Sequence, residues 1–210
     1  MKTIFTKLAT NYCSNNRLIE QLWNEINSVY THPKRYYHNF NHLQHLYDEL
    51  LEVKDEINDW NTVLFSLFFH DIVYNALRRD NEERSVIIAE NRLQSIDVPQ
   101  SIIDAVKEQI LATKSHKKSQ DSDTNYFIDA DLSILGQDFK QYGEYVTNIR
   151  QEYILYPDMI YKPGRKKVVE DFLQMDRIFK TDYFYNKYEK QARENLQLEL
   201  EEMSVTGYLH

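Results

Sequence analysis

The chain has 210 residues, of which 42% are hydrophobic and 28% are charged, a composition typical of one globular domain that can bury a core. Its formal net charge of −8 argues against binding to nucleic-acid polymers or anionic membranes, because both need clustered positive charge. A small anionic substrate is not excluded, since a bound metal reverses the local sign of charge. Cys13 is the only cysteine, so no internal disulfide can form and a reduced, cytoplasmic setting is expected.

The N-terminal segment MKTIFTKLATNYCSNN contains no apolar stretch of signal-peptide length. The most apolar run, VLFSLFF, is far too short to span a bilayer. We therefore expect no membrane partner.

Helical periodicity dominates the chain, which has only four glycines and four prolines, and no segment alternates as a strand would. Ser14 or Asn15 can cap a first helix that keeps its apolar residues on one side through Val29. Further helices are expected over residues 41–57 and 62–73. The second of these is apolar nearly all round, which predicts a central position.

The second half of the chain is predicted to be helical as well. Asp80 and Glu83 have the spacing of a capping box and start a helix through Leu93. A helix over residues 101–112 follows, and YFIDADLSILG is predicted to be helical up to Gly136. Three more helices are expected, and then a frayed tail over residues 204–210; the helices cover residues 138–155, 165–179 and 184–203. No repeat or linker divides the chain, so we predict one all-α domain with a core of about 14–203.

Three of the seven histidines fall within RYYHNFNHLQHL, at positions 38, 42 and 45. His38 and His42 are four residues apart, a spacing that places two side chains on one helix face, and His45 could join them. Neutral imidazole is the commonest metal ligand, so two such rings can point into one metal-binding pocket. The alternative is a surface or core pair without a ligand, because two-histidine spacing is a weak motif.

His70 and Asp71 directly follow the apolar run LFSLFF. A charged side chain there would be costly to bury unpaired, and the cost disappears if imidazole and carboxylate bind a cation together. The alternative is that Asp71 simply ends the helix in water.

Two further acids, Asp129 and Asp131, are embedded in the apolar stretch FIDADLSIL. Residues two apart on a helix diverge by roughly 200°, so only one of the two is expected to face the core. The side defined by Ile128, Leu132 and Leu135 favours Asp131 as the inward residue. Asp129 is then expected at the surface or behind a metal ligand.

A histidine, a His-Asp pair and a distant aspartate on an all-α chain resemble the signature of the HD superfamily of metal-dependent phosphohydrolases. Here the pattern reads His42, His70-Asp71 and Asp131, at intervals of 28 and 60 residues that are similar to those of the superfamily. Six segments resemble a bacterial subgroup of predicted HD phosphohydrolases, over roughly residues 30–200; they are RYYHNFNHL, FFHDIVYN, DNEERS, ATKSH, DADLSILG and KPGRKKVVEDFL. The resemblance implies a helical HD-type bundle that cleaves a small phosphomonoester or phosphodiester, with nucleotides among the candidate substrates.

The resemblance also implies that one divalent metal is bound by His42, His70, Asp71 and Asp131. Imidazole and carboxylate ligands suit Mn²⁺, Fe²⁺, Co²⁺, Ni²⁺ or Zn²⁺, and Mg²⁺ less readily. A second metal site would be short of ligands, because only His116 is available in the region where several two-metal HD enzymes supply them.

The segment YHNFNH is similar to the Y-H-N-x-x-H segment of cyclic-nucleotide phosphodiesterases, in which the first histidine protonates the leaving oxygen and the second binds metal. Carried over, His38 is the general acid and His42 the ligand. Those enzymes have a histidine three residues after the aspartate, where this chain has Tyr74. This departure argues against specificity for cyclic nucleotides.

Four further residues are candidates for substrate chemistry. Glu82 is a candidate general base, as a glutamate is in some related nucleotidases, and its alternative role is a helix cap. Lys114 and His116 in TKSHKK are candidate contacts to substrate phosphate, against the alternative of a solvated basic loop. Arg165 follows KPG at an expected helix start and is a candidate anion clamp, against the alternative of an ordinary surface arginine.

Two functions stay open on the sequence alone: a metal-dependent phosphohydrolase, and a regulatory HD module that binds a metal or nucleotide without turnover. A helical interaction protein with incidental histidines is disfavoured, because all four expected ligand positions are filled. The oligomeric state stays open.

Overall fold

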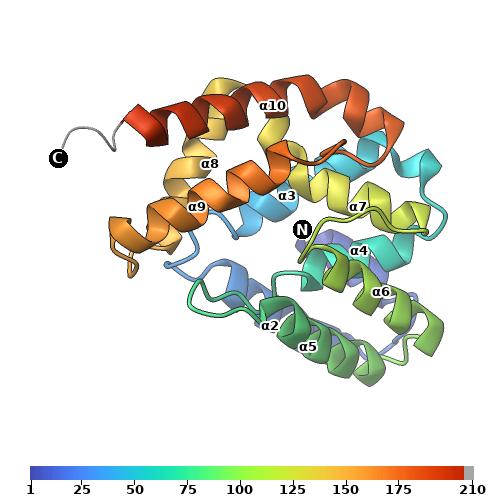
Figure 1. The fold of residues 1–210 in the computed structure, drawn as a ribbon. Helices are drawn as coiled ribbons and strands as arrows, with labels where there is room; N and C mark the ends of the chain where they lie inside the picture. Colours follow the sequence, from blue (N-terminus) through green and yellow to red (C-terminus); the bar gives the residue numbers. More distant parts are fainter. Residues whose placement is uncertain (206–210) are drawn as a thin grey trace. The chain divides into compact units, whose positions relative to one another are not determined.

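The computed structural model describes residues 1–205, and every regular element in that part of the chain is a helix (Figure 1). This confirms the all-α prediction. In chain order, the elements are α1 Lys2–Ala9, α2 Asn16–Tyr30, α3 Phe40–Glu52, the 3₁₀ helix η1 Lys54–Glu56, α4 Trp60–Phe69, α5 Asn81–Ser95, α6 Gln100–Ala112, α7 Ser122–Leu132, the 3₁₀ helix η2 Ser133–Gly136, α8 Phe139–Glu152, α9 Asp158–Leu173 and α10 Asp182–Val205.

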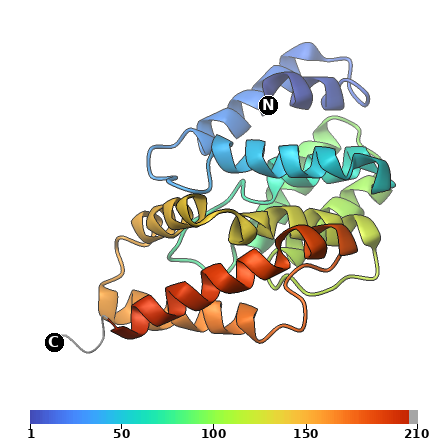
Figure 2. The same cartoon turned by 90° about the horizontal axis from the view of Figure 1, so that it is seen from above.

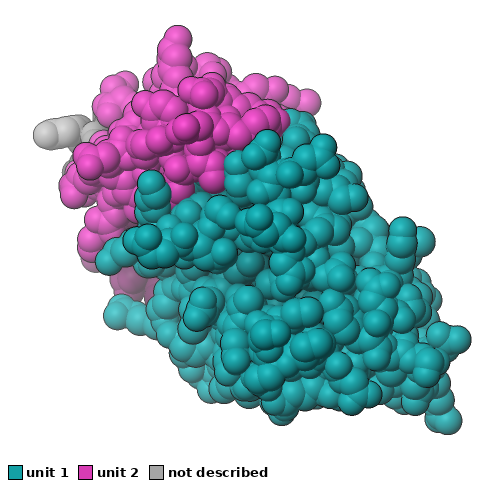
Figure 3. Space-filling model, turned by 90° about the vertical axis from the view of Figure 1, so that its right-hand side faces the viewer, with its two compact units in different colours: residues 1–130 teal, residues 131–210 magenta. Residues whose placement is uncertain are grey.

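The chain divides into two compact units, Met1–Ala130 and Asp131–His210 (Figure 3). The boundary falls inside α7, so residues 122–130 of this helix belong to the first unit and Asp131 follows directly. The expectation of a single domain stays a prediction.

Helix α4 is the centre of the first unit, where it packs against α1, α3, α5 and α6 (Figure 1). Every residue from Thr62 to Phe69 is buried, which agrees with the central position predicted from its sequence. Fully burying one such phenylalanine stabilises a fold by about 1.5–3 kcal/mol. Asp59 caps the helix by accepting a hydrogen bond from the Thr62 amide at 3.1 Å.

The N-terminus of α4 is further fixed by a buried carboxylate from α7. Asp123 accepts hydrogen bonds from the backbone amides of Asn58 and Asp59, at 2.9 and 2.7 Å. Backbone amides at the start of a helix have no carbonyl of an earlier turn to donate to, and here the Asp123 carboxylate accepts from both. This side chain therefore connects α7 to the start of α4.

Several predicted helix ends differ from those observed. The expected helix over residues 62–73 ends at Phe69, and the carbonyl groups of Leu67 and Phe68 at that end bond to the side chains of His70 and Tyr30. Asp80 is the N-cap of α5 but forms no capping bond, since its carboxylate binds Arg78 and Arg84 instead. Asn15 does cap α2, accepting from the Leu18 amide at 3.2 Å.

Helix α1 was not predicted from the sequence. It lies in the N-terminal segment, which was searched only for the apolar stretch of a signal peptide. Its 8 residues are too few to show a clear helical periodicity of apolar side chains. Phe5, Leu8 and Ala9 are nevertheless buried, and α1 packs on α2 and α4.

In the second unit, α10 packs along α9 and over η2, which α8 also contacts (Figures 1 and 2). Gly136 ends η2 with no left-handed backbone angle, so it is not the helix-ending conformation that its position suggested. A β-carbon at Gly136 would lie 2.5 Å from the Cβ atom of Tyr188 on α10. The glycine therefore serves the close approach of η2 and α10.

The C-terminal part of the chain departs from the predicted helices in two places. Helix α9 begins at Asp158, seven positions earlier than expected, and Pro163 lies inside it. Ser204 and Val205 belong to α10, and the rest of the expected frayed tail lies outside the described residues. No described helix combines the length and apolarity that a membrane crossing needs.

Candidate metal centre

Helix α3 and the turn before it place two of the predicted histidines. Asn39 caps α3 through the Asn41 amide at 2.8 Å, and its own side-chain amide donates to the Tyr36 carbonyl at 2.8 Å. His42 is therefore in the first turn of α3, and it is only 4% exposed. His38 precedes the helix, so the predicted shared helix face is wrong for this pair; the turn still brings their ring centroids to 5.8 Å.

His70 lies where α4 ends, and its backbone environment selects one tautomer. Its Nδ1 atom is 3.0 Å from the Leu67 carbonyl oxygen, which can only accept a hydrogen bond. The ring therefore carries its proton on Nδ1, and Nε2 keeps the lone pair that a metal needs. That Nε2 atom is 3.2 Å from Nε2 of His42.

Asp71 brings a carboxylate to the same two nitrogens. Its Oδ2 atom is 3.1 Å from Nε2 of His70 and 3.7 Å from Nε2 of His42. Burial by itself raises the pKa of Asp71, but the neighbouring imidazoles, that of His70 most, hold this pKa well below its ordinary value. The carboxylate is the form of this side chain that binds a metal.

Asp131 is the last member of the predicted ligand set His42, His70, Asp71 and Asp131, called the group of four below, and it lies close to both histidines. One of its carboxylate oxygens and one ring nitrogen each from His42 and His70 all lie within 4.8 Å of one another. Asp131 is carried by α7, whose preceding residues 122–130 belong to the same unit as both histidines. His45, which could have joined the histidine pair, is not part of this group in the part of the chain that the structure describes.

Asp129 is completely buried, so the expectation of a surface position is wrong. Helix α7 is buried on more than one side, since Phe127, Ile128 and Ala130 are also inaccessible. An acid two positions from Asp131 can for this reason face away from it without reaching water. Phe127 also packs edge-on against the His70 ring at 5.7 Å.

The spacing of the donors fits a first-row divalent metal. Two nitrogens that bind one metal at about 2.0–2.1 Å lie about 2.8–3.4 Å apart for octahedral to tetrahedral bond angles. The two Nε2 atoms are 3.2 Å apart, so both imidazoles can bind one ion with little movement. Two nitrogens and two carboxylates make a donor set that suits Mn²⁺, Fe²⁺, Co²⁺, Ni²⁺ or Zn²⁺.

His38 lies beside this group. Its Nε2 atom is 4.0 Å from Oδ2 of Asp71, and its ring stacks on Tyr74 with centroids 3.9 Å apart. Tyr74 occupies the position where the phosphodiesterases carry a further histidine, and here it supports the His38 ring. With 17% of its side chain exposed, His38 can exchange protons with a bound molecule or solvent.

Glu82 and Lys114 lie next to each other, with Lys114 Nζ 4.0 Å from the Glu82 carboxylate. Ser85, one turn after Glu82, is buried and its hydroxyl bonds to the Val73 amide at 3.1 Å, which ties α5 to the loop after Asp71. Lys114 also donates to the Arg79 carbonyl at 2.9 Å. Lys114 therefore contacts the loop that leaves the His-Asp pair, although neither it nor Glu82 belongs to the group of four.

His116 follows the end of α6 in a left-handed conformation with φ of 50°, which is uncommon for a residue other than glycine. Its amide donates to the Ala112 carbonyl at 2.9 Å, closing the turn after α6. It is half-buried and is not part of the group of four described above.

Arg165 does not lie at a helix start, because α9 begins at Asp158; the prediction of a helix N-terminus beside it is wrong. Pro163 and Gly164 precede it inside the helix, which continues through both residues to Leu173. Arg165 is buried and binds Glu199 through two hydrogen bonds of 2.7 and 2.9 Å. An anion-binding role would require this ion pair to open.

Arg35 and Tyr37 are site residues that the sequence did not reveal. Arg35 donates to the carbonyl oxygens of both His38 and Asp71, and the Tyr37 ring lies 4.9 Å from the ring of His42. Both residues belong to the histidine-rich segment itself. They were missed because they lie in a loop, where no periodicity indicates the direction of a side chain.

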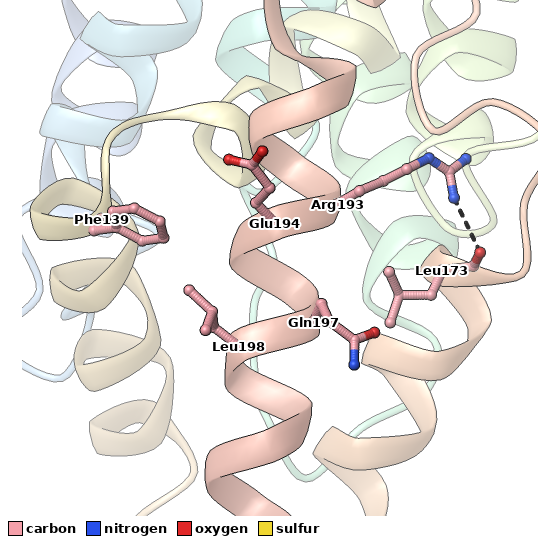
Figure 4. Close-up of a pocket in the computed structure, with 6 residues that line it drawn as sticks. All are labelled: Phe139, Leu173, Arg193, Glu194, Gln197 and Leu198. Atoms are coloured by element: carbon pink, nitrogen blue, oxygen red, sulfur yellow. Dashed lines mark hydrogen bonds between the residues drawn. The ribbon is translucent and has the colours of Figure 1, made fainter.

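An open hollow of about 620 Å³ lies in the second unit, over α10 (Figure 4). Phe139 of α8 lies on one side of α10 and Leu173 of α9 on the other (Figure 4). Its arginine, Arg193, donates to the Leu173 carbonyl at 3.1 Å, and Gln197 donates to Glu201 at 3.0 Å. The polar groups are thus used within the fold, and the hollow contains no candidate catalytic residue.

Comparisons with models of protein families, with curated proteins and with solved structures found no match to this chain.

Proposed function

We propose that this protein is a metal-dependent phosphohydrolase of the HD type, which cleaves a small phosphomonoester or phosphodiester. One divalent transition metal would be held by His42, His70, Asp71 and Asp131. The observation that carries the proposal is the 3.2 Å approach of two imidazole nitrogens beside the carboxyl group of Asp71. Residues separated by 28 and 60 positions contribute to this group, which a chance pair of histidines does not explain.

When bound, the metal supplies an acidified water and polarises a phosphoryl oxygen. The chain's own groups then have distinct tasks. His38 donates a proton to the leaving oxygen, which would otherwise depart as an unstable alkoxide. Tyr74 keeps the His38 ring in place by stacking on it at 3.9 Å.

Two neighbouring groups, Glu82 at the start of α5 and Lys114 just after α6, bind and orient the substrate. Lys114 neutralises charge on the phosphate, and Glu82 accepts a proton from the attacking water. Support for this pair comes from their 4.0 Å separation and from the tie between α5 and the loop after Asp71. Nucleotides are among the substrates to be tested, because the exposed ring of Tyr36, close to the histidines in the sequence, can stack on a base.

The proposal is tested by stripping the protein with EDTA and reloading it with Mn²⁺, Co²⁺, Ni²⁺ or Mg²⁺. Bound metal is measured by elemental analysis, and hydrolysis is followed with p-nitrophenyl phosphate, bis-p-nitrophenyl phosphate and a panel of nucleotides and sugar phosphates. We expect one metal per chain and turnover that disappears on stripping.

The variants His42→Gln and His45→Gln provide a matched pair on the same helix. Only the first removes a member of the group, so only the first is expected to lose metal and turnover. A protein that binds metal but hydrolyses none of the substrates would instead be the regulatory module. Equal metal content in both variants would contradict the proposed site.

A further inference from the structure

Arg35 connects the two loops that carry the site. Its Nη1 atom donates to the carbonyl oxygen of His38 at 3.1 Å and to that of Asp71 at 2.7 Å. Its Nη2 atom is 3.3 Å from the carbonyl oxygen of Ile72. One planar guanidinium thus donates to three peptide carbonyls. These carbonyls belong to two segments that lie far apart in the sequence, since 33 positions separate His38 from Asp71.

The same guanidinium is held between aromatic rings. Its carbon lies 4.9 Å from the ring centroid of Tyr30 and 5.9 Å from that of Tyr74. Tyr74 in turn stacks on His38 at 3.9 Å. Arg35 therefore reaches His38 by two routes, through the backbone carbonyl and through the tyrosine ring.

Arg35 is unusual in that its half-buried positive charge is bound by carbonyl oxygens and not by an acidic side chain in the described residues. Among residues 1–205, no carboxylate forms an ion pair with it, and its hydrogen bonds there go to main-chain carbonyls. The carbonyls of Asp71 and Ile72 belong to the segment that has just left α4, and the carbonyl of His38 lies in the turn before α3, so none of the three lies inside a helix. A buried carbonyl of this kind is costly to leave unpaired, so the arginine has a defined task in this loop.

We propose that Arg35 is a positioning residue that sets the distance between the proposed general acid His38 and the proposed metal ligand Asp71. This inference rests on the proposed function. Arg35 touches neither metal nor substrate; it holds the peptide groups of the two residues that do. Without it, the loops before α3 and after α4 lose their shared donor, and the carboxylate of Asp71 is no longer held 3.1 Å from Nε2 of His70.

The consequence for binding is a weaker and altered metal site rather than an unfolded protein. Groups that orient metal ligands typically cost about 10–100-fold in metal affinity when they are removed. Lysine cannot replace the arginine fully, because one ammonium group does not match the forked geometry that joins two carbonyls.

The test uses Co²⁺ as a coloured probe of the full-length protein. Wild type, Arg35→Ala, Arg35→Lys and the neighbouring exposed control Lys34→Ala are titrated with Co²⁺ while the visible absorption spectrum and the far-ultraviolet circular dichroism are recorded. We expect about 10–100-fold weaker binding and a changed spectrum for Arg35→Ala, an intermediate loss for Arg35→Lys, and a change below about twofold for Lys34→Ala. Tens of millimolar methylguanidinium should restore part of the wild-type spectrum to Arg35→Ala.

The outcomes separate this inference from the proposed function. If wild type binds no Co²⁺, the proposed function fails and the inference fails with it. If wild type binds Co²⁺ and both Arg35 variants bind it with the same affinity and spectrum, the inference alone is overturned. Should Arg35→Ala not fold, Arg35→Lys decides the question, since a wild-type spectrum and affinity in that variant would exclude a need for the forked donor.

Discussion

His70 illustrates how one residue acquires a role that its identity alone leaves open. The sequence places an imidazole after an apolar helix, but either ring nitrogen could face the centre. The Leu67 carbonyl at 3.0 Å decides this by accepting from Nδ1, which leaves Nε2 for a ligand. That carbonyl is available only because α4 ends at Phe69. The chemical state of the residue therefore depends on where a helix stops.

Replacing Asp71 by asparagine is expected to remove the metal with little effect on the fold. The variant keeps the size of the side chain but loses the charge that the imidazoles stabilise. We expect metal affinity to fall by about 100-fold or more, measured by competition with a chromophoric chelator. Asp48→Asn, an exposed change on α3, is the control and should bind as wild type does. Equal affinities would show that Asp71 is not a ligand.

Replacing His38 by alanine separates catalysis from metal binding. His38 lies 4.0 Å from Asp71 but is assigned the proton transfer, so metal content should persist while turnover falls by about 10²–10⁴-fold. Elemental analysis and steady-state kinetics on the same preparation provide the two readings. Loss of the metal in this variant would mean that His38 is a ligand and that the division of roles with His42 is wrong.

At the scale of helices, charged side chains are buried at positions where the periodicity of the sequence predicts exposed residues. Arg165 on α9 and Glu199 on α10 are both buried, and Tyr142 on α8 donates a hydrogen bond to the same carboxylate. Burial and the neighbouring Glu199 raise the pKa of Tyr142, which keeps its hydroxyl protonated as a donor. Three helices of the second unit thus converge on one carboxylate.

Substituting Glu199 by alanine should destabilise the protein by about 3–5 kcal/mol, because Arg165 would be left buried without its partner. The free energy of unfolding is measured by urea denaturation monitored by circular dichroism. Glu201→Ala, on the exposed side of the same helix, is expected to change stability by less than about 0.5 kcal/mol. A comparable small effect at Glu199 would indicate that the ion pair opens readily and would revive Arg165 as an anion contact.

Two glycines of the second unit predict opposite responses to alanine. At Gly136 the new methyl group would lie 2.5 Å from Cβ of Tyr188, so overpacking should cost about 1–3 kcal/mol. At Gly143, inside α8, the methyl group would meet nothing, and higher helix propensity should stabilise by about 0.5–1 kcal/mol. Thermal denaturation of both variants compares the signs directly. Two changes of the same sign would contradict the close packing of η2 on α10.

For the molecule as a whole, the proposed metal links distant parts of the sequence and should therefore stabilise the fold. A ligand that binds only the folded state adds about 2.7 kcal/mol at a concentration of 100 times its dissociation constant. We expect the thermal midpoint to rise with Mn²⁺ or Co²⁺ and to return on addition of EDTA. The Asp71→Asn variant should show no such rise, and a rise of equal size in that variant would place the stabilising metal elsewhere.

The amino-acid sequence was sufficient for the all-helical architecture, for the central position of the apolar helix and for the choice of His42, His70 and Asp131, which the structure brings together. Helical periodicity and the burial of apolar side chains are local properties, so they can be read without knowing which elements meet. Distances across the site depend instead on loops and helix ends. The position of His38 outside α3, the early start of α9, the burial of Asp129 and the contacts of Arg35 were decided by tertiary packing, because each depends on partners that lie far away along the chain.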